Sequence, residues 1–196
     1  GGMSCPIDHS NLTTDSSSDC AGNSTDYSTG RIASSIPKSG TEHTWLYPSP
    51  DQFHAAMQRK GHQVHKEDIS TILLMHNVVN EQCWQQVSRW ERESFGCDAF
   101  ALKRFQGRPD KLSPKAWLKS KILGYVRPFD RHDWIVERKD GAEVRYVIDF
   151  YSGKPSDTGQ GQVSVYLDVR PAIDSPRALM ARLNNWFQTK RSDWSK

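Results

Sequence analysis

The sequence lacks most of the features that would assign it to a common class of protein. No apolar run approaches the roughly 20 residues that span a bilayer, and no internal repeat occurs. The local signatures of phosphate-binding loops, Rossmann glycines, serine hydrolases and zinc peptidases are missing. No nucleophile is matched to a base by a local motif, so the chemistry has to be sought in other residues.

The sequence also has few cysteines and a small net charge. The four cysteines, Cys5, Cys20, Cys83 and Cys97, form no C-x-x-C pair and no zinc spacing. A disulfide framework is not expected in a chain of 196 residues, which is long enough to bury a core. The formal charge is only +3 and the basic residues are scattered, so nucleic acid is not the expected partner. An anionic small molecule or a membrane surface stays open.

The first 44 residues differ in composition from the rest, because Ser, Thr, Asp, Asn and Gly dominate them. Such a segment buries too little apolar surface to offset the entropy lost on ordering. We therefore expect residues 1–44 to be a disordered leader and residues 45–196 to form one folded domain. Within the leader, Cys5-Pro6 can present a thiolate to haem iron, or Cys5 can be an incidental surface cysteine.

The remainder predicts an α+β domain with several helices. Ser49 and Pro50 are typical of a helix start and predict a helix over 50–60. A long helix begins after Glu67-Asp68 and continues through Trp90. Irregular structure is expected after Gly96, followed by a short helix over 114–122.

Alternating apolar residues then predict a small antiparallel sheet of about three strands. They run over 134–138, 143–151 and 162–170, with a hairpin at Lys139-Asp140-Gly141. A last helix, capped by Asp174 or Ser175, continues through Trp186. The predicted fold is therefore a small antiparallel sheet packed with several helices, behind a disordered N-terminal leader.

The long helix carries a histidine in an apolar stripe. The stripe repeats at steps of three or four residues, the period of one helical face, and consists of Ile72, His76, Val79, Cys83, Val87 and Trp90. A neutral imidazole in this position can ligate a metal or a haem iron, donate a buried hydrogen bond, or simply pack in the core. The periodicity alone leaves these roles open.

One face of the predicted sheet carries charge. Arg145 and Asp149 share a face of the second strand, and Asp168 and Arg170 repeat the pair on the next. Buried arginines usually pair with carboxylates, which predicts a structural ion network. Alternatively, some of these arginines bind the carboxylates of a ligand in a bidentate fork. Arg138 could join either arrangement.

The segment Pro128–Trp134 (PFDRHDW) is dense in charged and aromatic residues. His132, between Arg131 and Asp133, could be a general acid or base, a second ligand, or a hydrogen-bonding structural residue. The residues by themselves indicate an α+β domain with a possible haem or anionic-ligand site.

These motifs together resemble the mitochondrial holocytochrome c synthase family, also called cytochrome c haem lyase. The resemblance covers the chain beyond residue 44, in the family's order. Its stretches are WLYPS from Trp45, FHAAMQRKG from Phe53, HNxxNExxW from His76, LSPKA from Leu112, PFDRHDW from Pro128, VRYVIDFY from Val144 and LDVRPAID from Leu167. Cys5-Pro6 matches a leader motif of the family, whereas Cys20 precedes Ala21 and matches none.

The resemblance implies an enzyme of the mitochondrial intermembrane space, peripheral to the inner membrane. It implies a lyase that joins haem b to apocytochrome c by adding the thiols of the substrate's C-x-x-C-H motif to the haem vinyl groups. In the family the histidine of HNxxNExxW is an axial haem ligand, which places that role on His76. The substrate's own histidine would supply the other ligand.

The same resemblance suggests further cofactor contacts. Trp45 could stack on the porphyrin, and the propionates could bind arginines, of which the candidates are Arg131, Arg138, Arg145 and Arg170. The remaining candidate cofactor-binding residues are Cys5, Tyr47, Asn80, Glu81 and His132. His54 stands where the family sometimes has an aromatic residue, which makes it an extra candidate near the haem rather than an inherited site.

Two other classes of function compete with a synthase. A non-catalytic haem sensor or carrier would bind haem without forming thioethers. A peptide-binding or assembly module would bind no haem and would show no Soret absorption. The match beyond the haem motifs favours the enzyme.

Overall fold

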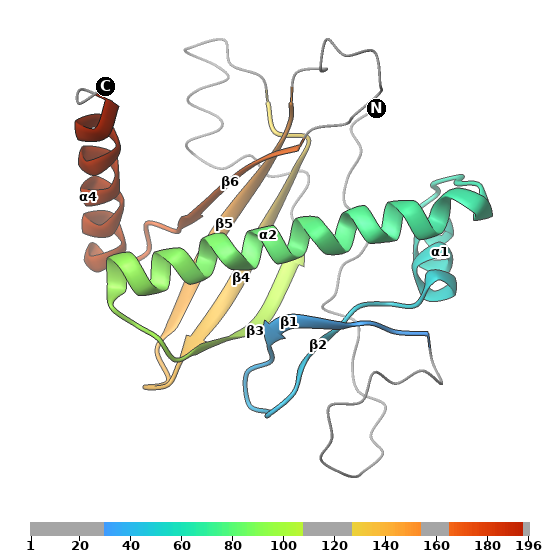
Figure 1. Cartoon of the computed structure of the whole chain (residues 1–196), viewed down its shortest axis with the longest axis horizontal. Helices are drawn as coiled ribbons and strands as arrows, with labels where there is room; N and C mark the ends of the chain where they lie inside the picture. Colours follow the sequence, from blue (N-terminus) through green and yellow to red (C-terminus); the bar gives the residue numbers. More distant parts are fainter. Residues whose placement is uncertain (1–29, 108–126, 154–164, 194–196) are drawn as a thin grey trace.

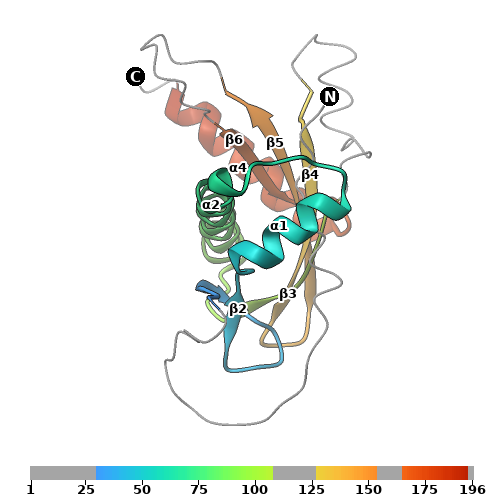
Figure 2. The same ribbon diagram turned by 90° about the vertical axis from the view of Figure 1, so that its right-hand side faces the viewer.

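The computed structural model describes residues 30–107, 127–153 and 165–193, which place a long helix across one face of an antiparallel sheet (Figures 1 and 2). The larger sheet, in the order β3-β4-β5-β6, is antiparallel throughout. A small sheet pairs β1 with β2. The elements are β1 (Ala33–Pro37), β2 (Thr44–Leu46), α1 (Pro50–Arg59), the 3-10 turn η2 (Lys66–Asp68), α2 (Ile69–Phe95), β3 (Phe100–Gly107), β4 (Asp130–Arg138), β5 (Glu143–Ser152), β6 (Val165–Pro171) and α4 (Pro176–Asp193).

The predicted α+β class is confirmed, and several boundaries follow from local chemistry. Ser49 caps α1 in a capping box with Gln52, and Pro50 occupies the first turn. Helix α2 ends at Gly96, which takes the left-handed conformation (φ 64°) that a residue without Cβ adopts at little cost. The β4–β5 hairpin turns at Gly141 (φ 79°), as predicted. Ser175 caps α4 by accepting from the Ala178 amide at 3.2 Å.

The core lies between α2 and the larger sheet. Cys83, Trp84 and Val87 of α2 pack against the face of β5 that presents Tyr146 and Ile148. A second apolar cluster joins α1 to the start of α2 and consists of Phe53, Met57, Ile69 and Leu73. Each end of α2 is therefore packed differently, against α1 at the N-terminal end and against the sheet beyond it (Figure 1). No helix in the described ranges combines the length and apolar character required to cross a membrane.

The expectation of irregular structure after Gly96 was wrong over 100–107, where β3 adds a fourth strand to the larger sheet in the described chain. The register of β3 against β4 shifts between Leu102 and Arg104. A bulge of this kind breaks the period of two, because Leu102 and Phe105 lie three residues apart yet both pack toward the core. The alternation that normally reveals a strand is therefore absent from the sequence.

The expectation that folded structure begins near Trp45 was also wrong, since β1 begins at Ala33. This strand is rich in serine, and only Ile36 places a large apolar side chain in the core. One anchor gives no periodicity for a sequence pattern to detect. The predicted leader otherwise falls on residues 1–29, and the predicted helix over 114–122 falls on 108–126; both lie outside the described residues.

The buried face of α2 is rotated around the helix axis relative to the predicted stripe. Of the six residues in the predicted stripe, only Cys83 and Val87 are fully buried, whereas His76 is half-buried. The buried face is displaced toward polar residues, because it includes Asn77, Asn80, Ser88 and Glu91. A pattern of apolar residues cannot detect these positions, so the predicted stripe marks the edge of the packed face.

Candidate functional site

His76 lies at the edge of the packed face of α2, with contacts on two sides of its ring. Its Nδ1 atom is 3.2 Å from the side-chain amide nitrogen of Asn80, one turn further along the helix. Its ring packs against Phe53 of α1, with 5.8 Å between the ring centroids. Because Phe53 is fully buried, the imidazole is held against a rigid neighbour.

The contact with Asn80 suits a histidine that ligates iron. Such a histidine binds the metal through one ring nitrogen while the other is held by a hydrogen bond, which fixes the tautomer and the ring plane. The Asn80 amide can turn its oxygen toward Nδ1–H, so Nδ1 would donate and Nε2 would be the ligating atom. Asn80 itself is 9% exposed and is therefore fixed by packing.

An exposed apolar patch lies on the same half of α2 as His76 but on another side of the helix. Leu74, Met75 and Val78, which we call the apolar strip, are 61%, 46% and 47% exposed. Residues two positions apart on a helix do not face each other, so Leu74 and Val78 lie on the side away from His76. The half-buried Ile72 and Val79 lie between the strip and His76 around the helix, and they are the apolar residues that border the imidazole.

Glu81 connects the polypeptide before α1 to α2. Its carboxylate accepts from the hydroxyl of Tyr47 at 2.8 Å and from the backbone amide of Ser35 at 3.0 Å. The Ser35 hydroxyl also donates to it. Burial, together with the bond to Glu81, raises the pKa of Tyr47 well above its usual range. Tyr47 and Glu81 therefore hold β1 and the segment after β2 against the half of α2 that carries His76.

Trp45 belongs to a separate aromatic group. Its indole N–H donates to the carbonyl of Leu102 at 3.0 Å, and its ring meets Phe105 edge-on at 5.0 Å between centroids. The ammonium of Lys38 lies 5.2 Å from the ring centroid. These contacts join the small sheet to β3. The predicted stacking of Trp45 on a porphyrin stays a prediction.

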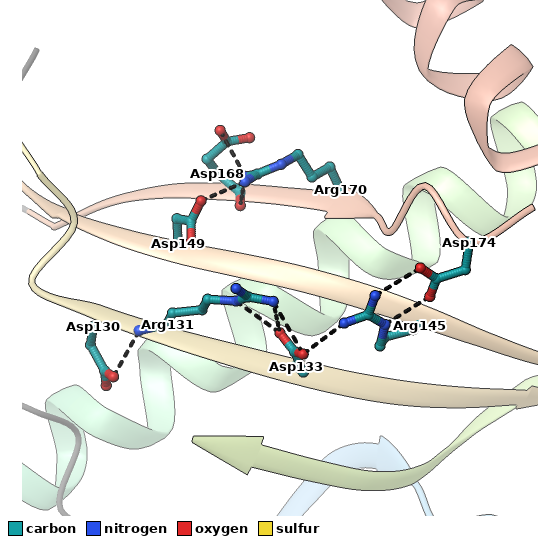
Figure 3. A network of polar contacts seen from close by, with 8 residues as sticks. All are labelled: Asp130, Arg131, Asp133, Arg145, Asp149, Asp168, Arg170 and Asp174. Atoms are coloured by element: carbon teal, nitrogen blue, oxygen red, sulfur yellow. Dashed lines mark hydrogen bonds and ion pairs between the residues drawn. The ribbon is translucent and has the colours of Figure 1, made fainter. Parts of the chain in front are cut away.

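The charged face of the larger sheet forms an arginine network (Figure 3). The guanidinium groups of Arg131 and Arg145 both bind Asp133, at 2.9 Å in each case. Arg145 also donates two hydrogen bonds of 2.7 Å to the Asp174 carboxylate. The hydrogen bonds that Arg145 donates to Asp174 and Asp133 raise the pKa of Arg145 despite its partial burial, and the bond from Arg145 lowers the pKa of Asp174.

Arg170 is the second centre of this network. Its guanidinium lies 2.5 Å from Asp149, which is fully buried, and 2.9 Å from Asp168. Burial alone would lower the pKa of Arg170, but the charges of Asp168 and Asp149 outweigh it and raise the pKa. The ion network expected for Arg145, Asp149, Asp168 and Arg170 is therefore present.

Arg138 takes part in a different pair, inside the core. Glu91 of α2 is fully buried and receives two bonds from Arg138, at 2.6 and 3.0 Å, and one from the hydroxyl of Tyr146 at 2.6 Å. Burial raises the pKa of Tyr146 far above its usual range, and the charge of Glu91 adds to the effect. These bonds fasten the C-terminal half of α2 to β4 and β5.

The structure brings His76 together with Asn80, but it does not bring the candidate arginines to them. Arg131, Arg145 and Arg170 lie on the face of the larger sheet opposite α2. Arg138 contacts α2 at Glu91, about 22 Å along the helix from His76 at 1.5 Å per residue. The role of these arginines as propionate partners stays a prediction, and each has a carboxylate partner within the protein.

His132 lies on β4 and faces the core rather than the arginine network. Its Nε2 is 3.3 Å from the Asp130 carboxylate, and its ring meets Phe150 edge-on at 5.1 Å. It is 3% exposed. His132 is therefore a buried residue beside Asp130, and its predicted roles stay predictions. Cys5 lies outside the described residues, and no group of three or more metal-binding side chains occurs within the part of the chain that the structure describes.

Sequence reasoning missed two residues of this site. Phe53 sets one side of the His76 ring, and Ser35 anchors Glu81. Phe53 lies in an amphipathic helix that the sequence did reveal, but its contact with His76 depends on how α1 packs. Ser35 lies in a strand that carries no apolar pattern, so no local signal could have indicated its role.

The model of the cytochrome c/c1 heme lyase family matches residues 6–100 and 96–186. The chain is 46% identical over 176 residues to a Schizosaccharomyces pombe protein provisionally named a holocytochrome-c1 synthase, covering 86% of this chain and 79% of that protein. It is 44% identical to the holocytochrome c-type synthase of Bos taurus (80% of this chain, 58% of the relative). It is 40% identical to the holocytochrome-c synthase of Saccharomyces cerevisiae (79% and 65%). No solved structure matches.

The structure defines an α+β protein with a half-buried histidine on a long helix that crosses its larger sheet. The family match covers nearly the whole described chain, including α2 and the larger sheet. The chain belongs to the cytochrome c/c1 heme lyase family.

Proposed function

We propose that this chain is a holocytochrome c synthase, which attaches haem b covalently to the C-x-x-C-H motif of an apocytochrome c. Each cysteine S–H adds across one haem vinyl group. A sulfur–carbon bond forms, the S–H bond and the vinyl double bond break, and the hydrogen ends on the vinyl carbon that the sulfur does not take. The reaction consumes no oxidant, and both haem and apocytochrome c are its substrates.

The observation that carries this proposal is the setting of His76. A half-buried imidazole, held by Asn80 and Phe53 and bordered by the half-buried Ile72 and Val79, can bind iron. Membership of the heme lyase family supports haem as the substrate. Glu81 and Tyr47 keep this half of α2 in place through their hydrogen bond, and their predicted contacts with the cofactor stay predictions.

This arrangement would accelerate thioether formation mainly by positioning. Iron fixed on His76 at one face and on the substrate's histidine at the other would orient the porphyrin plane relative to the two thiols. Holding reactants in this way supplies much of the rate enhancement in reactions that need no further chemical group. The thiols come from the substrate, which accounts for the absence of a local nucleophile motif.

The relatives' names support a holocytochrome c synthase, and we place the protein in the mitochondrial intermembrane space, peripheral to the inner membrane. Cys5-Pro6 would assist haem capture when haem is scarce. A non-catalytic haem carrier is the competing function. A carrier would bind haem but would leave no covalently attached haem on the cytochrome.

Coexpression with an apocytochrome c tests the proposal, followed by acid-acetone extraction. Covalent haem should remain with the cytochrome when the wild-type chain is present. His76→Ala should purify as a folded protein with little haem and should yield almost no holocytochrome. His65→Ala, which removes an exposed histidine at the N-cap of η2, is the matched control and should behave as wild type.

Haem that binds but is fully extracted by acid-acetone would point to a carrier instead. Wild-type haem content and product in His76→Ala would refute the assignment of the ligand. Loss confined to His132→Ala would move the ligand to β4. His76→Met should keep some haem with an altered Soret band, because a thioether can replace imidazole as an axial ligand.

A further inference from the structure

A surface hollow lies where α1 is joined to α2, at the end of the molecule opposite α4 (Figure 1). Its volume is about 520 Å³, within the range of about 300–1,000 Å³ that is typical of small-molecule sites. The residues that line it come from the end of α1 and from the segment before η2, and they are Gln58, Gly61, His62, Gln63, Val64 and His65. None of them is a candidate for binding haem.

The path of this segment is fixed by the end of α1. The backbone N–H of His62 donates to the carbonyl of Met57 at 3.1 Å, and that of Gly61 donates to the carbonyl of Gln58 at 2.9 Å. Gly61 takes the left-handed conformation (φ 77°) that such a helix end requires. These bonds occupy two carbonyls that would otherwise repel an anion at the negative end of α1.

The lining of the hollow offers hydrogen-bond donors and no carboxylate. It contains the imidazoles of His62 and His65 and the carboxamides of Gln58 and Gln63. The backbone N–H groups of Gln63, Val64 and His65 donate to no acceptor in the part of the chain that the structure describes. Donors of three kinds are therefore available to one ligand.

The charge of the surrounding sequence favours an anionic ligand. Residues 52–66 contain no Asp or Glu, whereas Arg59, Lys60 and Lys66 carry fixed positive charges. The next acidic residues along the chain belong to η2. Two imidazoles can also hold a metal ion such as Zn²⁺, but a lining without carboxylates among cationic neighbours disfavours a divalent cation.

We infer that the hollow binds the oxyanion group, phosphate or sulfate, of a small molecule. Such a group accepts several hydrogen bonds at once, and backbone N–H groups and cationic side chains are its usual partners in proteins. The inference goes beyond the proposed function, because the haem site depends on His76 and its neighbours on α2 and α1. It assigns the hollow to a second, separate ligand.

NMR titration of the purified full chain with sodium sulfate tests the inference. The amide signals of Gln63, Val64 and His65 should shift and saturate, whereas sodium chloride at equal ionic strength should leave them unchanged. Binding should tighten from pH 8 to pH 6, because imidazoles gain a proton in this range while sulfate keeps its charge. His54, whose Nε2 lies 3.4 Å from the Gln58 amide, also titrates.

The other charged groups of α1 and η2 near the hollow keep their charge over this range, and they are Arg59, Lys60, Lys66, Glu67 and Asp68. The double variant His62→Ala, His65→Ala removes two lining imidazoles. It should bind sulfate at least about tenfold more weakly and lose most of the pH dependence, because hydrogen bonds to a charged group are lost. His43→Ala, which removes an exposed histidine between β1 and β2, is the matched control and should bind as wild type.

Gln63→Glu distinguishes an anion site from a metal site. The change is nearly isosteric at an exposed side chain, so the fold should persist while a carboxylate enters the lining. Sulfate binding should disappear in this variant. A metal site would respond in the opposite way, because the new carboxylate would tighten the binding of Zn²⁺.

Four results would overturn the inference. They are no saturable shift with sulfate in the wild type, sulfate binding that weakens at pH 6, unchanged sulfate affinity in Gln63→Glu, and binding of Zn²⁺ alone. Haem titration of the same samples separates this inference from the proposed function, since all of these variants should bind haem as wild type does. A wild-type chain that binds sulfate but no haem would contradict the proposed function alone.

Discussion

The two halves of α2 differ in how their polar residues are used. In the C-terminal half, Glu91 is fully buried and bound by Arg138 and Tyr146, so its polar group is fully committed to the fold. In the N-terminal half, His76 is half-buried, and the exposed apolar strip lies on another side of the helix. One helix therefore combines a half that is anchored in the sheet through a buried charge with a half whose histidine is partly open to solvent.

This difference bears on what a substitution would cost. Replacing His76 removes a half-buried side chain and strands no buried charge, whereas replacing Glu91 leaves the Arg138 charge without its partner in the core. The comparison predicts that substitutions in the C-terminal half of α2 mainly lower stability. Substitutions beside His76 in the N-terminal half should mainly lower the affinity for haem.

The largest expected effect is on stability, in Glu91→Ala. This variant leaves the Arg138 guanidinium without its partner in a buried site, which should lower the free energy of unfolding by about 3–5 kcal/mol. Urea unfolding or soluble yield measures the loss. Glu93→Ala is the matched control, because Glu93 pairs with Arg89 at the exposed surface of the same helix and should cost less than about 1 kcal/mol. Equal losses in the two variants would contradict the proposed anchoring of this half.

The next effect should appear in haem binding, in Asn80→Ala. This change removes the hydrogen bond that holds Nδ1 of His76, and loss of such a partner typically lowers affinity by about 10–100-fold. Melting temperature should fall little compared with Glu91→Ala. Soret titration of the purified variant measures the affinity, with Gln82→Ala as an exposed control on the same helix. Unchanged affinity in Asn80→Ala would show that Asn80 does not hold the ligand.

Much of the fold could be predicted because its signals are local. The cap at Ser49 and Pro50 depends on residues within one turn, and the hairpin at Gly141 depends on a single positive φ. The division of β5 into an apolar and a charged face follows from strict alternation, and the structure confirms it. In these cases one element carries all the information.

The rest depends on contacts between distant parts of the chain. Glu91 and Arg138 are 47 residues apart, and nothing local to either residue indicates their pairing. The bulge in β3 removes the alternation that would reveal the strand, and β1 has only Ile36 as an apolar anchor. The histidine of the candidate site was found by its position in a stripe and by family resemblance. Its contacts with Phe53 and Asn80 required the packed structure.

A smaller effect on stability is expected in Arg145→Ala. Asp133 keeps its bonds to Arg131 in this variant, and Asp174 is largely exposed, so no buried carboxylate is left alone. The free energy of unfolding should fall by about 1–2 kcal/mol, in the range of a hydrogen bond to a charged group. Thermal unfolding and haem occupancy are to be measured on the same sample. Normal stability with lost haem would show instead that Arg145 holds a propionate, contrary to the ion-network interpretation.

The smallest effect concerns pH and the pair of Arg145 with Asp174. The bond from Arg145 lowers the pKa of Asp174 in the folded protein below its usual value of about 3.9. A depressed carboxyl pKa contributes stability that is present above the pKa of the unfolded chain and is lost as the pH falls through the folded value. Wild type should therefore be slightly more stable than Asp174→Asn at neutral pH, and this difference should shrink as the pH falls below about 4. Because Asp174 is 53% exposed, salt should reduce the difference further. Melting temperatures of both proteins across the acid range measure it, and a difference that stays constant from neutral to acid pH would show that the pair contributes nothing through the charge of Asp174.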